Sequence, residues 1–196
     1  TDEPMVHLLP HWNFKGHENE VIKVFAYSNV SQLELFLNGK SLGVQNIARI
    51  AHGEWDVPYE SGKLEVLAYK NGEVVAKDVR ITSKDPYKLM LKLENDDISA
   101  NGKDIAVVSC YAVDEDGNEV YDCDCLVEFT SNEFGTIYST GSDVSDHVSL
   151  FSPVRKMREG RIGVAVKLGN KEGVLKVNAI SDGLLPATLE INLSCK

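Results

Sequence analysis

Residues suited to metal chemistry gather near the start of the chain, where His7, His11 and His17 lie within eleven residues. His7 and His11 are four residues apart, a spacing that puts two imidazoles on one face of a helix and suits a metal ion. Pro10 lies between them, and a proline inside a helix removes a hydrogen bond and clashes with the preceding turn. We therefore expect the histidines to be structural, and we expect neither a metal site nor a cofactor.

Trp12 is the residue of this segment best suited to contact a sugar, because an aromatic face covers the apolar CH face of a pyranose ring. The alternatives are a position in a hydrophobic core or a wedge between two domains, since large aromatic side chains are highly buried on average. Trp55 alternates with Glu54 and Asp56, as in a strand with one buried face, so we expect it in a core.

Acidic side chains form clusters of the kind that supplies oxygen ligands to calcium. None of them has the D-x-[DN]-x-[DN]-G-x5-E spacing of a calcium loop, and Asp116-Gly117 is typical of a turn. The sequence also places no two glutamates across a cleft, as cleavage of a glycosidic bond by paired carboxylates requires. The clusters are Asp96-Asp97, Asp114-Glu115-Asp116 and the pair Asp122 and Asp124.

The segment TGSDVSDH contains the residue types of a serine hydrolase: Asp143, Asp146 and His147 with Ser142 or Ser145. A nucleophilic serine of that kind lies on a sharp turn between a strand and a helix, and no such pattern surrounds either serine. We expect a polar loop here, and no catalytic residue anywhere in the chain.

The cysteines do not have the paired Cys-x2-Cys spacing of a zinc site. Cys110 lies in the apolar run AVVSCYAV and is expected to be a small buried hydrophobic residue. Cys123 and Cys125 point to the same side of an extended segment, and Cys195 lies near the end of the chain. A Cys110–Cys123 disulfide is among the pairings that four cysteines allow, but we favour free thiols, which are typical of a reducing, cytoplasmic compartment.

The net charge and the short apolar runs of the chain exclude several classes of partner. With 20 Lys and Arg against 30 Asp and Glu, the net charge of −10 argues against nucleic acid and against anionic membranes as partners. Apolar runs such as Ile105–Val108 are far shorter than the ~20 residues of a membrane helix. The first residues are acidic and unlike a signal peptide, and a start at Thr1 without Met suggests a piece of a longer protein, so its localisation stays open.

The sequence predicts that short β-strands position the candidate residues described above. LELFLNGKSLG, residues 33–43, alternates apolar and polar residues up to Asn38-Gly39, a pair that tolerates positive φ at both centres of a type I′ turn. Asn71-Gly72 marks a second tight hairpin. Seven strands at about ten-residue spacing are typical of an immunoglobulin-like sandwich. The predicted strands are Val6–Asn13, Ile22–Ser28, Leu33–Asn38, Lys40–Gln45, Gly53–Pro58, Lys63–Lys70 and Val74–Ser83.

Lys84-Asp85-Pro86 interrupts this pattern, and a second series of strands follows. Ile105–Asp114 is apolar on both faces and should be central, whereas Ser152–Gly160 fits a loop, an edge strand or one helical turn. We predict an all-β protein of two tandem immunoglobulin-like β-sandwich domains, residues 1–83 and 87–196, with the linker 84–86. The second series is Lys88–Glu94, Ile105–Asp114, Leu126–Ser131, Gly135–Ser139, Val148–Phe151, Arg161–Leu168, Val174–Ser181 and Ala187–Leu193.

Two sets of motifs carry a family resemblance. HLLPHWNF, followed by VFAYSNVSQLELFLNGKSLG, resembles the domain just after the catalytic barrel in many β-galactosidases of glycoside hydrolase family 2. The second half resembles a further, bacterial (invasin-type) immunoglobulin-like sandwich of those enzymes. Its motifs are DISANGKDIAVVSCYAVDEDGNEV, GSDVSDH, RKMREGRIGVAVK and GVLKVNAISDGL.

The resemblance implies a non-catalytic, C-terminal part of a larger glycosidase, whose acid/base and nucleophile glutamates lie on a barrel outside this chain. Its partners would be that barrel, an oligosaccharide at the barrel rim and further copies in an oligomer. Some relatives carry an aromatic side chain from a C-terminal domain to the rim, and the matching position here is Trp12, with His11 and Asn13 beside it. Phe14 stands where many relatives have a second tryptophan, so the stacking of this segment on a sugar would be altered or lost.

Two alternatives stay open at this point. The chain could be an independent carbohydrate-binding or adhesive module, which a surface row of aromatic residues would favour, or it could hold zinc through Cys and His side chains.

Overall fold

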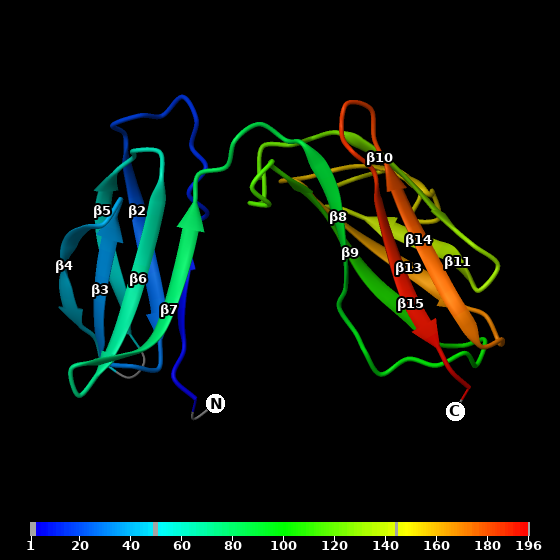
Figure 1. Ribbon diagram of the computed structural model, residues 1–196. Helices are drawn as coiled ribbons and strands as arrows, with labels where there is room; N and C mark the ends of the chain where they lie inside the picture. The colour runs from blue at the N-terminus through cyan, green and yellow to red at the C-terminus, as the bar shows by residue number, and fades with distance from the viewer. Residues whose placement is uncertain (1–2, 49–50, 144, 196) are drawn as a thin grey trace. The chain divides into compact units, whose positions relative to one another are not determined.

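The computed structural model describes residues 3–48, 51–143 and 145–195, and within them the secondary structure is all strand and turn, with no helix. The chain divides into two compact units, Thr1–Thr82 and Ser83–Lys196 (Figure 1). Each unit consists of two packed antiparallel sheets, so the predicted all-β class with two β-sandwiches is confirmed. Ser83, predicted at the end of the first domain, belongs to the second unit. No described segment forms a helix of the length and apolarity that crossing a bilayer requires.

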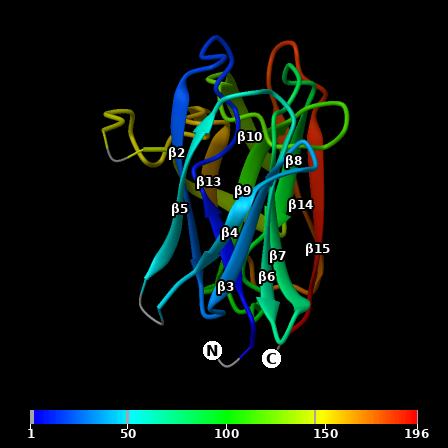
Figure 2. The same ribbon diagram turned by 90° about the vertical axis from the view of Figure 1, so that its left-hand side faces the viewer.

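The first unit contains seven strands in two sheets (Figure 2). One sheet has the order β1-β2-β5 and the other the order β4-β3-β6-β7, and every pair is antiparallel. The alternation in the sequence decides which side chains enter the space between the sheets: Leu33 and Leu35 of β3 are fully buried. The strands are β1 (Val6–Leu9), β2 (Val21–Ser28), β3 (Gln32–Leu37), β4 (Lys40–Asn46), β5 (His52–Pro58), β6 (Lys63–Lys70) and β7 (Glu73–Ile81).

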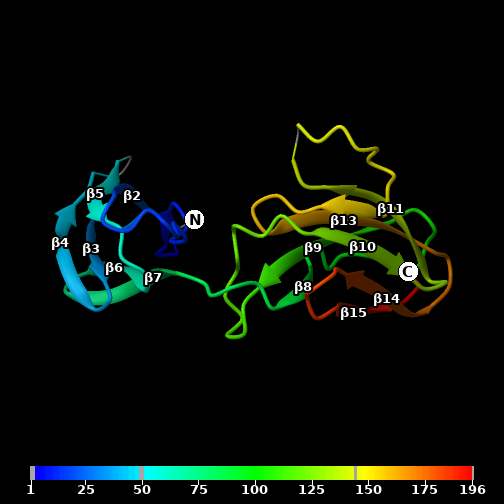
Figure 3. The same ribbon diagram turned by 90° about the horizontal axis from the view of Figure 1, so that it is seen from above.

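The second unit contains eight strands, in the sheet orders β12-β10-β14-β15 and β11-β13-β9-β8. Figure 3 shows its two layers, together with the irregular segment 145–153 that leads into β12. The core between the layers is built from alternate apolar residues of nearly every strand. The strands are β8 (Lys88–Leu93), β9 (Ile105–Val113), β10 (Leu126–Ser131), β11 (Gly135–Gly141), β12 (Val154–Lys156), β13 (Arg161–Leu168), β14 (Gly173–Ile180) and β15 (Ala187–Leu193).

The strand β9 is central in its sheet, as predicted, but only one of its two apolar faces is buried. The strand pairs with β13 on one side and β8 on the other, so it is central in its sheet. Only the face with Val108 and Cys110 is buried, however, while Ile105 and Val107 on the other face are 36% and 44% exposed.

Two strand predictions were wrong, one in its extent and one altogether. Val6–Asn13 forms a strand only as far as Leu9, because Pro10 has no N–H to donate to a ladder. Val148–Phe151 forms turns and no strand, since carbonyl groups of this segment accept hydrogen bonds from a buried side chain described below. Of the three alternatives for Ser152–Gly160, the edge strand is confirmed: β12 pairs with β10.

The Asn38-Gly39 turn has the backbone that the sequence predicts, with φ of 49° and 80°. The Asn38 side chain also ties this hairpin to the neighbouring β5–β6 connection. Its Oδ1 accepts from the backbone N–H of Lys63 (2.8 Å), and its Nδ2 donates to Glu60 Oε1 (3.0 Å) and to the Ser61 carbonyl (3.1 Å).

Replacing Asn38 by Ala should therefore lower the free energy of unfolding of the first unit by about 2 kcal/mol, from a strained positive φ and lost hydrogen bonds. Asn71→Ala is the matched control, because Asn71 has the same kind of φ, 56°, at the other tight hairpin. We expect about 1 kcal/mol there. Urea unfolding followed by tryptophan fluorescence measures both, since Trp12 and Trp55 both lie in the first unit. Equal losses would contradict the role of the Asn38 side chain.

Candidate functional site

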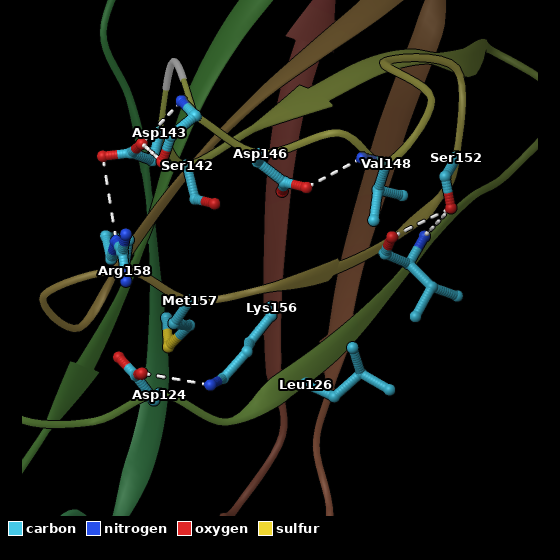
Figure 4. Close-up of a pocket in the computed structure, with 12 residues that line it drawn as sticks. Asp124, Leu126, Ser142, Asp143, Asp146, Val148, Ser152, Lys156, Met157 and Arg158 are labelled. Carbon is cyan, nitrogen blue, oxygen red and sulfur yellow. Dashed lines mark hydrogen bonds and ion pairs between the residues drawn. The ribbon is translucent and has the colours of Figure 1, made fainter.

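A hollow of about 470 Å³ lies in the second unit, between the segment 142–152 and the strands β10 and β12 (Figure 4). The segment side carries mainly hydroxyl and carboxylate groups, among them Ser142, Asp143 and Asp146. The strand side carries Lys156 and an apolar surface that includes Leu126. A volume of this size falls in the range of small-ligand sites, and the mixture of apolar and polar groups suits a hydroxyl-rich ligand.

The strand side of the hollow follows from alternation in two neighbouring strands. In β12, Arg155 points into the unit while Val154 and Lys156 on either side of it line the hollow. Lys156 is the register partner of Leu126 in β10, and Leu126 is 61% exposed. The edge strand therefore supplies both the wall of the hollow and the residue that anchors its opposite side.

Arg155 is 1% exposed and holds the segment 142–152 over the sheet edge. Its Nη1 donates to Asp146 Oδ2 (2.6 Å) and to the Val148 carbonyl (3.2 Å). Its Nη2 donates to the carbonyls of Thr140 and Ser149, both at 2.8 Å, and its Nε to the Thr140 hydroxyl (3.2 Å). A buried guanidinium requires such partners, and here they come from the end of β11 and the loop that follows it, so the side chain determines the loop's path.

The two carboxylates on the loop are stabilised in their ionised form. The Ser145 hydroxyl and backbone N–H donate to Asp143, and Arg158 lies nearby at 3.7 Å, which together lower the pKa of the Asp143 carboxyl. The backbone N–H of Val148 and the Arg155 guanidinium lower the pKa of Asp146. Both groups are charged at neutral pH, a state that suits acceptance of hydrogen bonds from hydroxyl groups and opposes proton donation.

The structure places Trp12 in the core of the first unit, with an exposed fraction of 0%. Its Nε1–H donates to the Glu60 carbonyl (2.9 Å), and its ring packs edge-on against Tyr59 with centroids 5.2 Å apart. No face of the indole is open to a sugar ring. This contradicts the stacking role for Trp12 and confirms the core alternative; Trp55, 7% exposed, is a core residue as predicted.

His11 and Asn13, the neighbours of Trp12, are half-buried and shape the turn after β1. The His11 ring stacks on Phe14 at 4.7 Å, and its Nδ1 accepts from the Asn13 backbone N–H (3.2 Å). Phe14 also packs against Tyr59, so the residue that differs from many relatives is part of the same aromatic cluster. A position of His11 and Asn13 at a substrate rim stays a prediction.

Asp114 and Asp146, two of the acidic candidates, have structural partners. Asp114 is fully buried and, although burial opposes its charge, hydrogen bonds from the backbone N–H groups of Lys84 (3.0 Å) and Asn118 (2.8 Å) lower the pKa of its carboxyl. In the TGSDVSDH segment, Asp146 binds Arg155, and Asp143 accepts hydrogen bonds from Ser145. Over the described ranges, no three His, Cys, Asp or Glu side chains converge in a way that would hold a metal ion.

Sequence reasoning missed Arg155 and with it the hollow. The sequence held only a weak indication that Arg155 is buried. Arg155 is the middle residue of a three-residue strand, and the sequence did not decide whether this segment is a loop, an edge strand or a helical turn.

Comparison with known proteins identifies the family to which this chain belongs. Residues 89–190 match the family model described as glycoside hydrolase family 2 C-terminal domain 5. The chain belongs to glycoside hydrolase family 2. Residues 19–76 match a domain family of unknown function (DUF4982). The predicted membership is thus confirmed, and the matched region is the C-terminal one.

Family 2 relatives match nearly the whole chain. Beta-galactosidase BoGH2A of Bacteroides ovatus is 34% identical over 197 residues, covering 98% of this chain and 23% of that protein. A β-glycosidase structure from Bacteroides vulgatus has a TM-score of 0.91 at 26% identity, covering 98% of this chain and 25% of that one. A family 2 structure from Bacteroides cellulosilyticus has a TM-score of 0.86 at 29% identity, covering 98% and 29%. The chain spans about a quarter of the length of these relatives.

Replacing Arg155 by Ala should lower the free energy of unfolding of the second unit by about 3–5 kcal/mol, because it removes a buried ion pair and leaves loop carbonyls unsatisfied. Arg158→Ala is the matched control three residues away: that side chain is 54% exposed, its ion pair with Asp143 is long, and we expect less than about 1 kcal/mol. Hydrogen exchange of peptides from β9 and β13 follows this unit selectively. Equal losses for the two variants would refute the anchoring role.

The stability that Asp146 of this loop contributes to the second unit should decrease at acidic pH. Because the pKa of Asp146 is lowered in the folded state, its contribution to stability is complete above the unfolded value of about 3.9 and is lost as pH falls through the folded value. Asp146→Asn should therefore lower the Tm at pH 5 to 7, and the difference from the wild type should shrink towards pH 2.5. Thermal unfolding of both proteins across this range measures it. A difference that stays constant would show that the charge of Asp146 has no such role.

Proposed function

We propose that this chain is the non-catalytic, C-terminal accessory part of a β-galactosidase-like glycosidase, and that its two sandwiches support the catalytic barrel of the same protein. The observation that carries the proposal is the match of residues 89–190 to a C-terminal domain of family 2. A β-galactosidase is the relative at 34% identity, and this chain spans only 23% of it. The remaining three quarters of such a protein leave room for a separate catalytic domain.

The protonation of the carboxyl groups supports a non-catalytic role. Hydrolysis of a glycosidic bond needs a carboxylic acid that stays protonated near neutral pH, which means a raised pKa. In the described part of the chain, each carboxyl group with a shifted pKa has it shifted downward. These groups are Glu18, Glu54, Glu94, Asp114, Asp143 and Asp146.

Exposed apolar side chains in the first unit support a docking role. The outer face of the β1-β2-β5 sheet carries Leu9 and Val21, which are 42% and 63% exposed, together with Tyr27 at 45%. The ion-paired Lys23, Glu54 and Asp56 lie between them on the same face, and a mixture of apolar and charged groups is typical of interfaces between domains of one chain.

A specific observation favours the alternative of a carbohydrate-binding module. Phe25 and Tyr27 lie two apart on β2 and share the outer face of that sheet, and His52 of β5 contacts both rings, with centroids 5.3 and 5.1 Å away. This patch, unlike Trp12, presents aromatic surface for a sugar ring.

Two measurements on the isolated chain separate the functions. We expect no hydrolysis of a chromogenic β-galactoside above the rate with an inert β-sandwich protein, whereas the longer protein that contains the chain should hydrolyse it. Turnover by the chain alone would overturn the non-catalytic role. Calorimetry with galactose, lactose and plant oligosaccharides tests the alternative: micromolar binding that Tyr27→Ala abolishes would favour the binding module over a supporting domain.

A further inference from the structure

Cys123 and Cys125 occupy an environment unlike that of the other cysteines. They flank Asp124 in the segment that leads into β10, and all four cysteines of the chain are free thiols in the structure. Cys123 is 6% exposed and belongs to the core of the second unit. Cys125 is half-buried and lines a hollow of about 240 Å³, beside Ile180 and Ser181. One thiol of the pair is thus enclosed and the other is open to small solutes.

Hydrogen bonds fix the backbone at both cysteines, and a sulfur contact fixes the side chain of Cys125. The Cys123 and Cys125 carbonyls accept hydrogen bonds from the N–H groups of Gly160 (3.1 Å) and Met157 (2.8 Å). The Cys125 sulfur lies 3.4 Å from the Met157 sulfur. The Cys123 and Ser181 side chains are near enough to the Cys125 sulfur to influence its charge.

These contacts give the thiols of Cys123 and Cys125 different pKa values and therefore different reactivities. Hydrogen bonding from Cys123, with a smaller effect of Ser181, lowers the pKa of Cys125 to about 6, while the same interaction raises the pKa of Cys123. Burial raises the pKa of Cys110 to about 12. The thiolate is the nucleophilic form of cysteine, so Cys125 is the reactive member of the set.

The charged groups around Cys125 are mainly acidic and oppose its thiolate. Asp124 has this effect directly, but it is ion-paired with Lys156 of β12 at 3.1 Å. Glu128 of β10 and Asp182 after β14 line the same hollow. The hydrogen bonds from Cys123 and Ser181 are therefore the interactions that favour the charged form.

We propose that Cys123 and Cys125 form a reversible thiol–disulfide pair, in which Cys125 reacts first with a peroxide that enters through the hollow and Cys123 resolves the product. The Cα atoms of residues two apart are separated by at most about 7 Å, close to the 4.4–6.8 Å of a disulfide, so a slight bend at Asp124 permits the bond. This proposal does not depend on the glycosidase proposal.

The chemistry balances with hydrogen peroxide as the oxidant. The Cys125 thiolate attacks one peroxide oxygen, the O–O bond breaks, and hydroxide leaves, giving a sulfenic acid. The Cys123 sulfur then attacks the Cys125 sulfur and loses its proton, the S–O bond breaks, and water leaves. Two thiols lose two electrons and one peroxide is reduced to two waters. A dithiol such as dithiothreitol reverses the change by exchange.

Alkylation by iodoacetamide at pH 6, mapped to each cysteine by mass spectrometry, tests the reactive thiol. The same chain unfolded in urea is the matched reference, because an ordinary cysteine has a pKa of about 8.5. Folded Cys125 would then hold more thiolate than unfolded Cys125, and after its lower nucleophilicity is taken into account we expect a rate advantage of about tenfold. We expect folded Cys125 to react faster than unfolded Cys125, whereas Cys110 and Cys123 react faster when unfolded. In Cys123→Ala the advantage of folded Cys125 should fall at least about threefold.

Treatment with hydrogen peroxide tests the resolving step. In the wild type, the peptide containing both residues should lose the mass of two hydrogens, and dithiothreitol should restore it. In Cys123→Ala, a sulfenic acid should persist on Cys125 and react with dimedone. Unfolding that accelerates alkylation of Cys125, as it does for a merely buried thiol, would overturn the proposal. So would peroxide that leaves both thiols intact while it oxidises the exposed Cys195.

Discussion

A cation excluded from water must have a hydrogen-bond partner for each of its donors, and Arg155 imposes this requirement on the second unit. Its guanidinium collects one carboxylate, one hydroxyl and three backbone carbonyls, all of them from residues 140–149. The segment therefore folds back over the edge strand that carries the arginine. The candidate hollow exists because this interaction holds the loop away from the outer side of β12, where Val154 and Lys156 form the facing wall.

Local sequence signals were sufficient for most of the fold because they act over a few residues. Alternation in β3, β6 and β13 predicted the strands to within a residue, since each outward polar residue is flanked by inward apolar ones. Asn38-Gly39 predicted its turn because few residues other than Asn and Gly adopt positive φ readily. The same logic predicted that β9 is central but not that one of its apolar faces is exposed, which depends on what covers the sheet.

The features that escaped prediction depend on partners distant in sequence or on a choice between two environments. Val148–Phe151 has strand-forming residues, but its carbonyl groups bind Arg155, and nothing in the segment itself reveals that competition. Residue type favours a buried position for Trp12 but also suits a sugar platform, so it does not decide between them. The contacts that decide it are with Tyr59 and with the Glu60 carbonyl, almost fifty residues away.

The hollow and the thiol pair share structural elements, so a change at one should reach the other. Asp124 lies between Cys123 and Cys125 and also lines the hollow, where it pairs with Lys156. Met157 contacts the Cys125 sulfur and lines the hollow as well. A disulfide needs a bend at Asp124, and the bend would move its carboxylate relative to Lys156. Arg155 lies on β12, and Met157, which contacts the Cys125 sulfur, follows that strand directly. The oxidation state of the pair would therefore act on the hollow through Asp124 and Met157, which line it.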